Sequence, residues 1–154
     1  MLMRLDWAAL DLAFETSDIE HGSWLDRLTG EVLWALEGDD PEDREAVLRR
    51  IDAQPKRYVA IEPPDARAQW EWMSEFTESV PDAHLRDLLG VALDGRGAFR
   101  RFKDVLLGVP QERQRWHTFR DDRMREAMTR FLEEAGVRTD NPPPWAANPR
   151  PDPP

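Results

Sequence analysis

The sequence of 154 residues contains no cysteine, and it has no long uncharged hydrophobic run. The absence of cysteine excludes thiol catalysis, structural disulfides and thiolate metal or iron–sulfur sites. The apolar runs are only a few residues long, far short of a membrane span, and the N-terminus lacks the shape of a signal peptide. We therefore expect a soluble, cytoplasmic protein that does not insert into a membrane.

Basic side chains are scarce relative to acidic ones, with 21 Lys and Arg against 31 Asp and Glu and a net charge of −10. This balance argues against a general nucleic-acid coat or an anionic-membrane binder, since both neutralise phosphate with positive charge. The charge is uneven, however. Residues 1–94 hold 9 basic and 22 acidic side chains, whereas residues 95–130 hold 10 basic and 5 acidic ones.

The common catalytic and metal-binding motifs are missing from the sequence. The three histidines, His21, His84 and His117, are far apart and form no pair with metal-ligand spacing. No Gly-x-Ser-x-Gly elbow and no Gly-x-x-x-x-Gly-Lys phosphate loop is present. Acidic residues are abundant, but paired catalytic acids must converge in a cleft, which a sequence does not show. We expect no cofactor and no metal.

Turn and capping residues divide residues 1–138 into helices and short strands. Helices are expected after Asp6, over 41–53, after Asp65, after Asp82, between Gly97 and Gly108 and from Pro110, with 116–119 either helical or extended. Strands are expected over 22–25 and 32–36, joined by a turn at Gly30, and over 57–61. The pattern predicts an α+β fold: a helix-dominated single domain, residues 1–138, with a small two- or three-stranded antiparallel sheet.

A proline-rich tail follows this predicted domain. Residues 139–154 contain seven prolines in sixteen positions, a composition typical of an extended, disordered segment. We expect this tail to be dispensable for stability. Trp145 within it is a candidate partner-binding residue, of the kind presented by docking peptides, and the alternative is an inert tail.

The segment 94–103 is the most informative for function. Two glycines, Gly95 and Gly97, precede a predicted helix, and backbone N–H groups converge at such a helix start. Positive charge surrounds it, so an acidic ligand, phosphate or partner helix would fit. The candidate ligand-binding residues are Arg96, Gly97, Arg100, Arg101 and Lys103. The alternative is structural, with Asp94 capping the helix and Arg100 pairing with Asp104.

Trp70 and Trp72 are two positions apart on a predicted helix, so their side chains point to different sides. One of the two is expected to face solvent or to form part of an interface, and Trp72 is the candidate partner-binding residue. The alternative is that both are half-buried under neighbouring segments.

Three blocks of sequence, together with Arg115-Trp116 and the closing helix, resemble a known family. The blocks are WLDxxTGEVL at 24–33, RYVxIxP at 57–63 and GRGAFRRFKD at 95–104. In this order they are similar to the bacterial uncharacterised protein family 0158, over roughly residues 6–138. The resemblance implies one domain and a bacterial source, and it carries no catalytic residue to transfer. Glu62, between Ile61 and Pro63, departs from the simpler Ile-Pro of the family.

These observations favour a small, non-enzymatic binding or regulatory module that recognises an acidic protein or small anionic ligand through its basic C-terminal helical region. Two alternatives stay open. One is a nucleic-acid or nucleotide binder using residues 95–130, where basic and aromatic residues alternate, although the net charge disfavours it. The other is an enzyme with acidic catalytic residues in a cleft.

Overall fold

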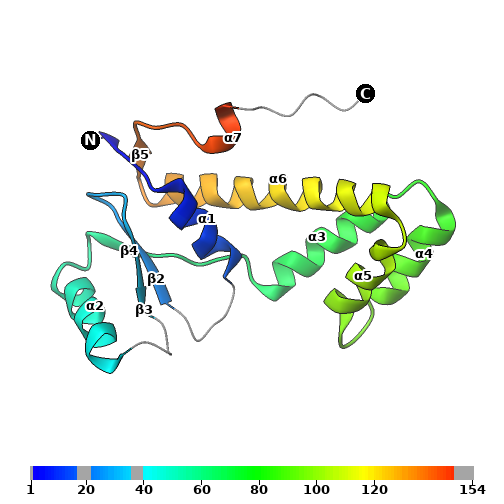
Figure 1. Ribbon diagram of the computed structural model, residues 1–154, viewed down its shortest axis with the longest axis horizontal. Coiled ribbons are helices and arrows are strands. Elements are labelled where there is room, and N and C mark those ends of the chain that lie inside the picture. Colours follow the sequence, from blue (N-terminus) through cyan, green and yellow to red (C-terminus); the bar gives the residue numbers. More distant parts are fainter. Residues whose placement is uncertain (1, 17–21, 36–39, 148–154) are drawn as a thin grey trace. The chain divides into compact units, whose positions relative to one another are not determined.

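The computed structural model describes residues 2–16, 22–35 and 40–147 (Figure 1). The chain divides into two compact units. The first unit is built from residues 1–63 and 128–154, and the second from residues 64–127. The long helix α6 (Pro110–Glu134) contributes residues to both units.

The first unit contains a three-stranded antiparallel sheet of order β3-β2-β4. The strands are β2 (Gly22–Asp26), β3 (Val32–Ala35) and β4 (Tyr58–Ala60). The β2–β3 turn places Gly30 at a φ of +78°, and a Cβ added there would lie 2.4 Å from the carbonyl oxygen of Arg4. The predicted hairpin is therefore confirmed, and its turn requires glycine. Leu36, the predicted end of the second strand, lies outside the described residues.

Two helices of the first unit begin at the aspartates that the sequence marks as caps. In α1 (Trp7–Glu15), the Asp6 carboxylate accepts a hydrogen bond from the Ala9 N–H at 3.1 Å. In α2 (Pro41–Ala53), Asp40 accepts one from the Glu42 N–H at 2.9 Å. The buried face of α1 includes Phe14, whose ring meets that of Phe131 edge-on, with centroids 5.6 Å apart.

A pair of short parallel strands, which the sequence did not predict, joins the two chain ends of this unit. Strand β1 (Leu2–Met3) pairs with β5 (Arg138–Thr139). Beyond it, the Asn141 side chain accepts from the Leu5 N–H and donates to the Leu5 carbonyl, both at 2.8 Å. The short helix α7 (Pro144–Ala147) follows. Residues 139–147, which composition assigned to the disordered tail, thus make tertiary contacts that a count of prolines does not reveal.

The second unit is helical. It comprises α3 (Ala66–Glu78), α4 (Ala83–Ala92), α5 (Ala98–Leu107) and residues 110–127 of α6. Asp65 and Asp82 cap α3 and α4 as predicted, since each carboxylate accepts a backbone N–H three residues later. The extended alternative for residues 116–119 is wrong, because this segment lies inside α6. Trp116 and Phe119 are one helical turn apart, and their rings stack at 6.0 Å.

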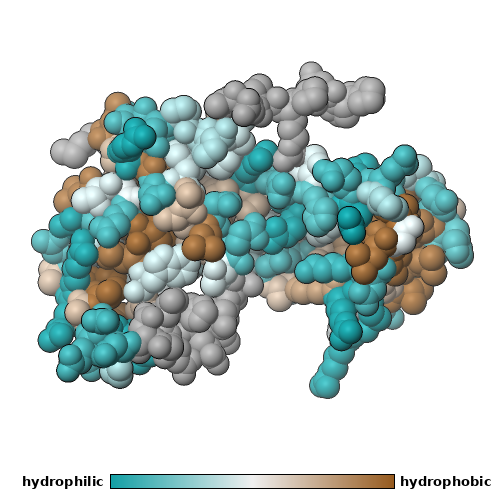
Figure 2. Space-filling view, viewed as in Figure 1, coloured by the Kyte–Doolittle hydropathy of each residue, from teal (hydrophilic) through white to brown (hydrophobic). Residues whose placement is uncertain are grey.

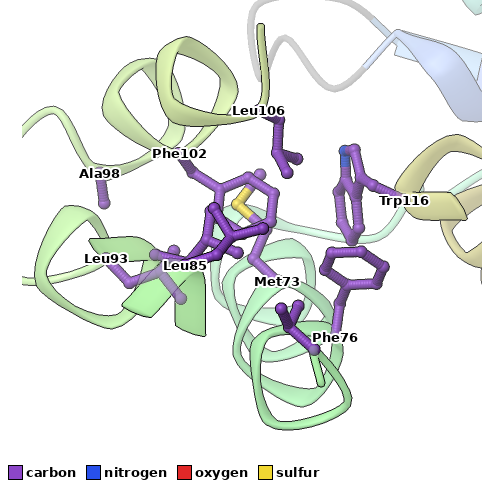
Figure 3. Packing of buried hydrophobic residues seen from close by; sticks show 10 residues of the cluster. Met73, Phe76, Leu85, Leu93, Ala98, Phe102, Leu106 and Trp116 are labelled. Carbon is purple, nitrogen blue, oxygen red and sulfur yellow. The ribbon is translucent and has the colours of Figure 1, made fainter. Parts of the chain in front are cut away.

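An aromatic cluster forms the core of the second unit (Figure 3). Phe76 of α3 and Phe102 of α5 are fully buried, and both present their rings edge-on to Trp116 of α6, at 5.5 and 5.1 Å between centroids. Edge-to-face contacts of this kind add specific geometry to the burial of large apolar surfaces. The remaining members are aliphatic or methionine side chains: Met73, Val80, Leu85, Leu89, Leu93, Ala98 and Leu106.

The observed architecture confirms the predicted fold class, a helix-dominated α+β protein with a small antiparallel sheet. The prediction that residues 1–138 form a single domain stays a prediction. None of the helices within the described ranges is long and apolar enough to cross a membrane.

Candidate functional site

The buried carboxylate of Asp26 ties the first two sequence blocks together. It sits at the end of β2 and accepts two hydrogen bonds from Arg57, Nε to Oδ1 at 3.0 Å and Nη2 to Oδ2 at 2.8 Å. The N–H groups of Leu28 and Thr29 also donate to Oδ1. Burial alone raises the pKa of Asp26, but these hydrogen bonds outweigh it and lower the pKa to about 2. Asp26 therefore stays ionised and holds the hairpin to the strand, a structural role.

Arg101 ties the third block together in a similar way. Its guanidinium donates to the carbonyl oxygens of Ala92, at 3.2 Å, and of Asp94 and Arg96. These carbonyls lie at the end of α4 and in the loop before α5, where helix geometry leaves them without intrahelical partners. Arg101 thus fixes the α4–α5 connection. The sequence predicts that Arg101 binds a ligand, but its guanidinium N–H groups donate to carbonyl oxygens of its own chain.

The backbone at the start of α5 has no capping side chain. Gly97 is the N-cap residue with a φ of +75°, and no side chain caps this end of the helix. The suggestion that Asp94 caps it is therefore wrong. The first amide bonded within α5 is that of Arg101, to the Gly97 carbonyl at 3.1 Å, so the N–H groups of residues 98–100 point out of the helix end.

A surface hollow of about 550 Å³ lies against this helix start, and we call it the α3–α5 hollow. Its lining comes from the first turns of α3 and from the loop and first turn of α5. The residues are Ala66, Arg67, Trp70, Gly95, Gly97, Ala98, Phe99 and Arg100. The hollow combines helix N–H groups, two arginines and two aromatic rings, so it offers both positive potential and a flat apolar wall.

The two arginines of the α3–α5 hollow are weakly engaged by their own helices. Arg67 approaches Glu71 at 3.4 Å and Arg100 approaches Asp104 at 4.0 Å, each one turn along. The arginine side chains remain 87% and 91% exposed. Exposed pairs of this kind contribute little energy, so both guanidinium groups can turn to an anion at small cost. The predicted Arg100–Asp104 contact is present, but in this weak form.

The structure brings together only some of the predicted ligand-binding residues. Gly97 and Arg100 line the α3–α5 hollow, whereas Arg96 and Lys103 are exposed outside its lining. The sequence did not single out Arg67 or Phe99 for this site. The capping residue Asp65 places Arg67 in the first turn of a helix, but its approach to α5 is a tertiary contact that local patterns do not encode.

The three candidate tryptophans lie in different surroundings. Trp72, the candidate partner-binding residue, packs against the aromatic core and is partly buried. Trp70 is the more exposed of the pair, at 40%, and its indole N–H donates to the Leu93 carbonyl at 2.9 Å. Trp145 packs edge-on against Trp7, with ring centroids 5.3 Å apart. Trp70 is therefore the tryptophan that borders the candidate site.

Metal chemistry gains no support from the described part of the chain, where no three His, Asp or Glu side chains are grouped in a way that could hold an ion.

Comparisons with known proteins place this chain in a family. The model of an uncharacterised protein family, UPF0158, matches residues 1–140. A UPF0158 protein of Pseudomonas aeruginosa is 31% identical over 137 residues, covering 88% of this chain and 86% of the relative. No solved structure matches the chain significantly. The chain belongs to the UPF0158 family, as its sequence blocks indicated, and the α3–α5 hollow lies within the matched region.

Proposed function

We propose that this protein is a non-enzymatic binding or regulatory module, and that it recognises an anionic group in the α3–α5 hollow. The anionic group is a carboxylate or phosphate, presented by an acidic protein or a small ligand. The observation that carries the proposal is the uncapped start of α5, which opens into a hollow flanked by Arg67 and Arg100. Backbone N–H groups and mobile arginines are the donors that carboxylates and phosphates prefer.

The aromatic walls extend this proposal to the shape of the ligand. Trp70 and Phe99 line the same hollow as the two arginines. An anion attached to an apolar or planar group would place its charge at the helix start and its body against these rings. The ligand class is thus an anion with an apolar part rather than an isolated inorganic ion.

The packing of the basic stretch does not favour the nucleic-acid alternative. Its aromatic residues Phe102 and Trp116 lie in the core, with 0% and 3% exposure, so they are not available for stacking on bases. Several of its arginines have acidic partners within the chain. Arg115 is 2.8 Å from Glu112, and Arg123 is 2.7 Å from Glu75.

The most buried carboxylate gives little support to the alternative that the protein is an enzyme. Asp26 is the buried acidic residue of the described chain, and Arg57 keeps it ionised with its oxygens already hydrogen-bonded. Such a carboxylate is unsuited to donate or accept protons near neutral pH.

Titration followed by amide NMR tests the proposal directly. The probes are inorganic phosphate and a capped peptide rich in glutamate and phenylalanine, added to the full chain at low salt. We expect the amide signals of residues 97–100 and the indole signal of Trp70 to shift with saturation, more tightly for the peptide. Chemical-shift changes spread over all of residues 95–130 would contradict the proposal. So would the absence of any change with both phosphate and the peptide.

A further inference from the structure

A second hollow lies between α3 and α4, and we call it the α3–α4 groove. Its volume is about 650 Å³. From α3 it is lined by Trp70, Ser74, Thr77 and Glu78, and from α4 and the residue pair after it by Arg86, Asp87, Gly90, Val91, Leu93 and Asp94. On α3 these positions follow helical spacing from Trp70 to Glu78, eight steps along the helix with a rise of about 12 Å. The groove therefore runs along two helical turns.

The charge of the α3–α4 groove is opposite to that of the α3–α5 hollow. Glu78, Asp87 and Asp94 supply three carboxylates along its length, and the structure shows no ion pair for any of them within the described residues. The one cation in the lining is Arg86, whose guanidinium donates to the Val80 carbonyl at 3.0 Å. A negative potential therefore extends along the groove.

The groove also has exposed apolar surface. Val91 is 73% exposed, and Trp70 borders the groove at the end where its indole bonds Leu93. Gly90 lies in the last turn of α4, and a Cβ added there would meet no atom within 4 Å. Glycine has no side chain, so at this position it leaves room for another segment to approach the helix closely. Figure 2 shows hydrophobic residues reaching the surface over α4 and α5 among hydrophilic ones.

We propose that the α3–α4 groove docks a basic amphipathic helix of a partner protein. The side-chain ridges of a third helix fit between two packed helices. The small residues Ser74, Thr77 and Gly90 allow the third helix to approach closely. Its apolar side chains would cover Val91 and the Trp70 ring, and its lysines or arginines would face Glu78, Asp87 and Asp94. Charge complementarity thus selects the basic partner. Trp70 borders both hollows, but the other lining residues differ, and the charges of the groove are opposite in sign to those of the anion site.

The test uses a fluorescein-labelled, capped peptide of about 14 residues, with leucine at every third or fourth position and lysine on both flanks. Its binding to the full chain is followed by fluorescence anisotropy. We expect a dissociation constant below about 0.1 mM at low salt, weakening as salt rises. A peptide with glutamate in place of each lysine should bind at least about tenfold more weakly.

Two groups of variants locate the binding. The double variant Glu78→Lys/Asp87→Lys should weaken lysine-peptide binding at least about tenfold, while Glu45→Lys/Asp52→Lys on α2 makes the same charge change and should leave it within about twofold. Gly90→Leu fills the floor of the groove and should abolish binding without lowering the melting temperature. Loss of binding with an unchanged melting temperature shows that the groove is blocked and that the protein is still folded.

Three results would overturn the proposal. These are no binding of the lysine peptide at about 0.1 mM, equal binding of the glutamate peptide, or groove variants that bind as the parent does.

Discussion

Arg57 donates two hydrogen bonds, of 2.8 and 3.0 Å, to the buried carboxylate of Asp26. This ion pair connects the β2–β3 hairpin to the start of β4, the strand that follows α2. Bidentate arginine–carboxylate contacts are strong and fix geometry as well as distance. Arg50 extends the arrangement, because its Nε donates to the Tyr58 hydroxyl at 2.9 Å while its guanidinium lies 3.6 Å from Glu31. Asp26 of the first family block and Arg57 of the second therefore have a structural role.

The lowered pKa of Asp26 predicts a specific loss of stability in acid. Because the folded-state pKa of about 2 lies below the unfolded value of 3.8, the unfolded chain takes up the proton first as the pH falls. About 2 kcal/mol of stability, fully present above pH 4, should disappear as the pH falls toward about 2. Urea unfolding of the parent and of Asp26→Asn, at pH 6 and near pH 2, measures this contribution.

We expect Asp26→Asn to cost on the order of 3 kcal/mol at pH 6, since it leaves a buried site with an unpaired arginine. The difference between parent and variant should shrink in acid. Glu31→Gln is the control, because Glu31 is 55% exposed and its pair with Arg50 should contribute less than about 1 kcal/mol. A parent–variant difference that does not change with pH would mean that the Asp26 carboxylate is not held ionised by Arg57.

Replacing Gly30 and replacing Gly90 by residues with side chains should have opposite effects on stability. Gly30→Val should damage folding, because φ is +78° and the new Cβ would collide with the Arg4 carbonyl. The strained backbone alone costs about 1–3 kcal/mol. Gly90→Ala should instead stabilise the protein by about 1 kcal/mol, because Gly90 is helical and the space around it is open. Melts followed by circular dichroism compare the two, and a Gly30→Val melt equal to that of the parent would show that the turn tolerates a side chain.

The C-terminal contacts predict where truncation begins to matter. Ending the chain after residue 147 should leave the melting temperature unchanged. Ending it after residue 138 should lower the melting temperature by several degrees, because the Asn141–Leu5 hydrogen bonds and the Trp7–Trp145 contact are lost. The single change Asn141→Ala in the full chain should give part of that loss. If both truncated chains and the Asn141→Ala variant melt as the parent does, the tail is dispensable from residue 139, as the sequence predicts.

Arg100 and Arg101 are neighbours with different expected phenotypes. Arg101→Gln should lower the melting temperature by a few degrees, because three carbonyl groups around the α4–α5 connection lose a charged donor. Arg100→Gln should leave it unchanged, since the Arg100 side chain is 91% exposed and its contact with Asp104 is long. Thermal melts of the two single variants, made in parallel, measure this difference, and the opposite order would reverse the two roles.

Much of the fold follows from local sequence signals. Asp6, Asp40, Asp65 and Asp82 mark helix starts because a carboxylate bonds nearby backbone N–H groups. Gly30 marks the hairpin because the turn needs a positive φ. In contrast, β1 and β5 are two residues each and lie more than 130 positions apart in the sequence, so no local pattern predicts their pairing.

The candidate site was predictable only in part. The glycines before α5 and the adjacent Arg100 identified the helix start, but Arg101 has the same residue type and a structural role. Which of two neighbouring arginines turns back to the chain depends on the path of the α4–α5 loop. The approach of Arg67 and Trp70 to this helix is likewise set by packing over the shared core, not by spacing in the sequence.

The most direct test of anion recognition at the α3–α5 hollow compares affinities of two double variants. Isothermal titration of the glutamate–phenylalanine peptide into Arg67→Gln/Arg100→Gln should show at least about a tenfold loss of affinity, with an unchanged melting temperature. The matched variant Arg44→Gln/Arg49→Gln, which removes the same charge from α2, should bind within about twofold of the parent. Equal affinity in all three proteins would contradict the account. Tighter, salt-sensitive binding of DNA or RNA that the first variant abolishes would also contradict it, and would favour nucleic acid as the ligand.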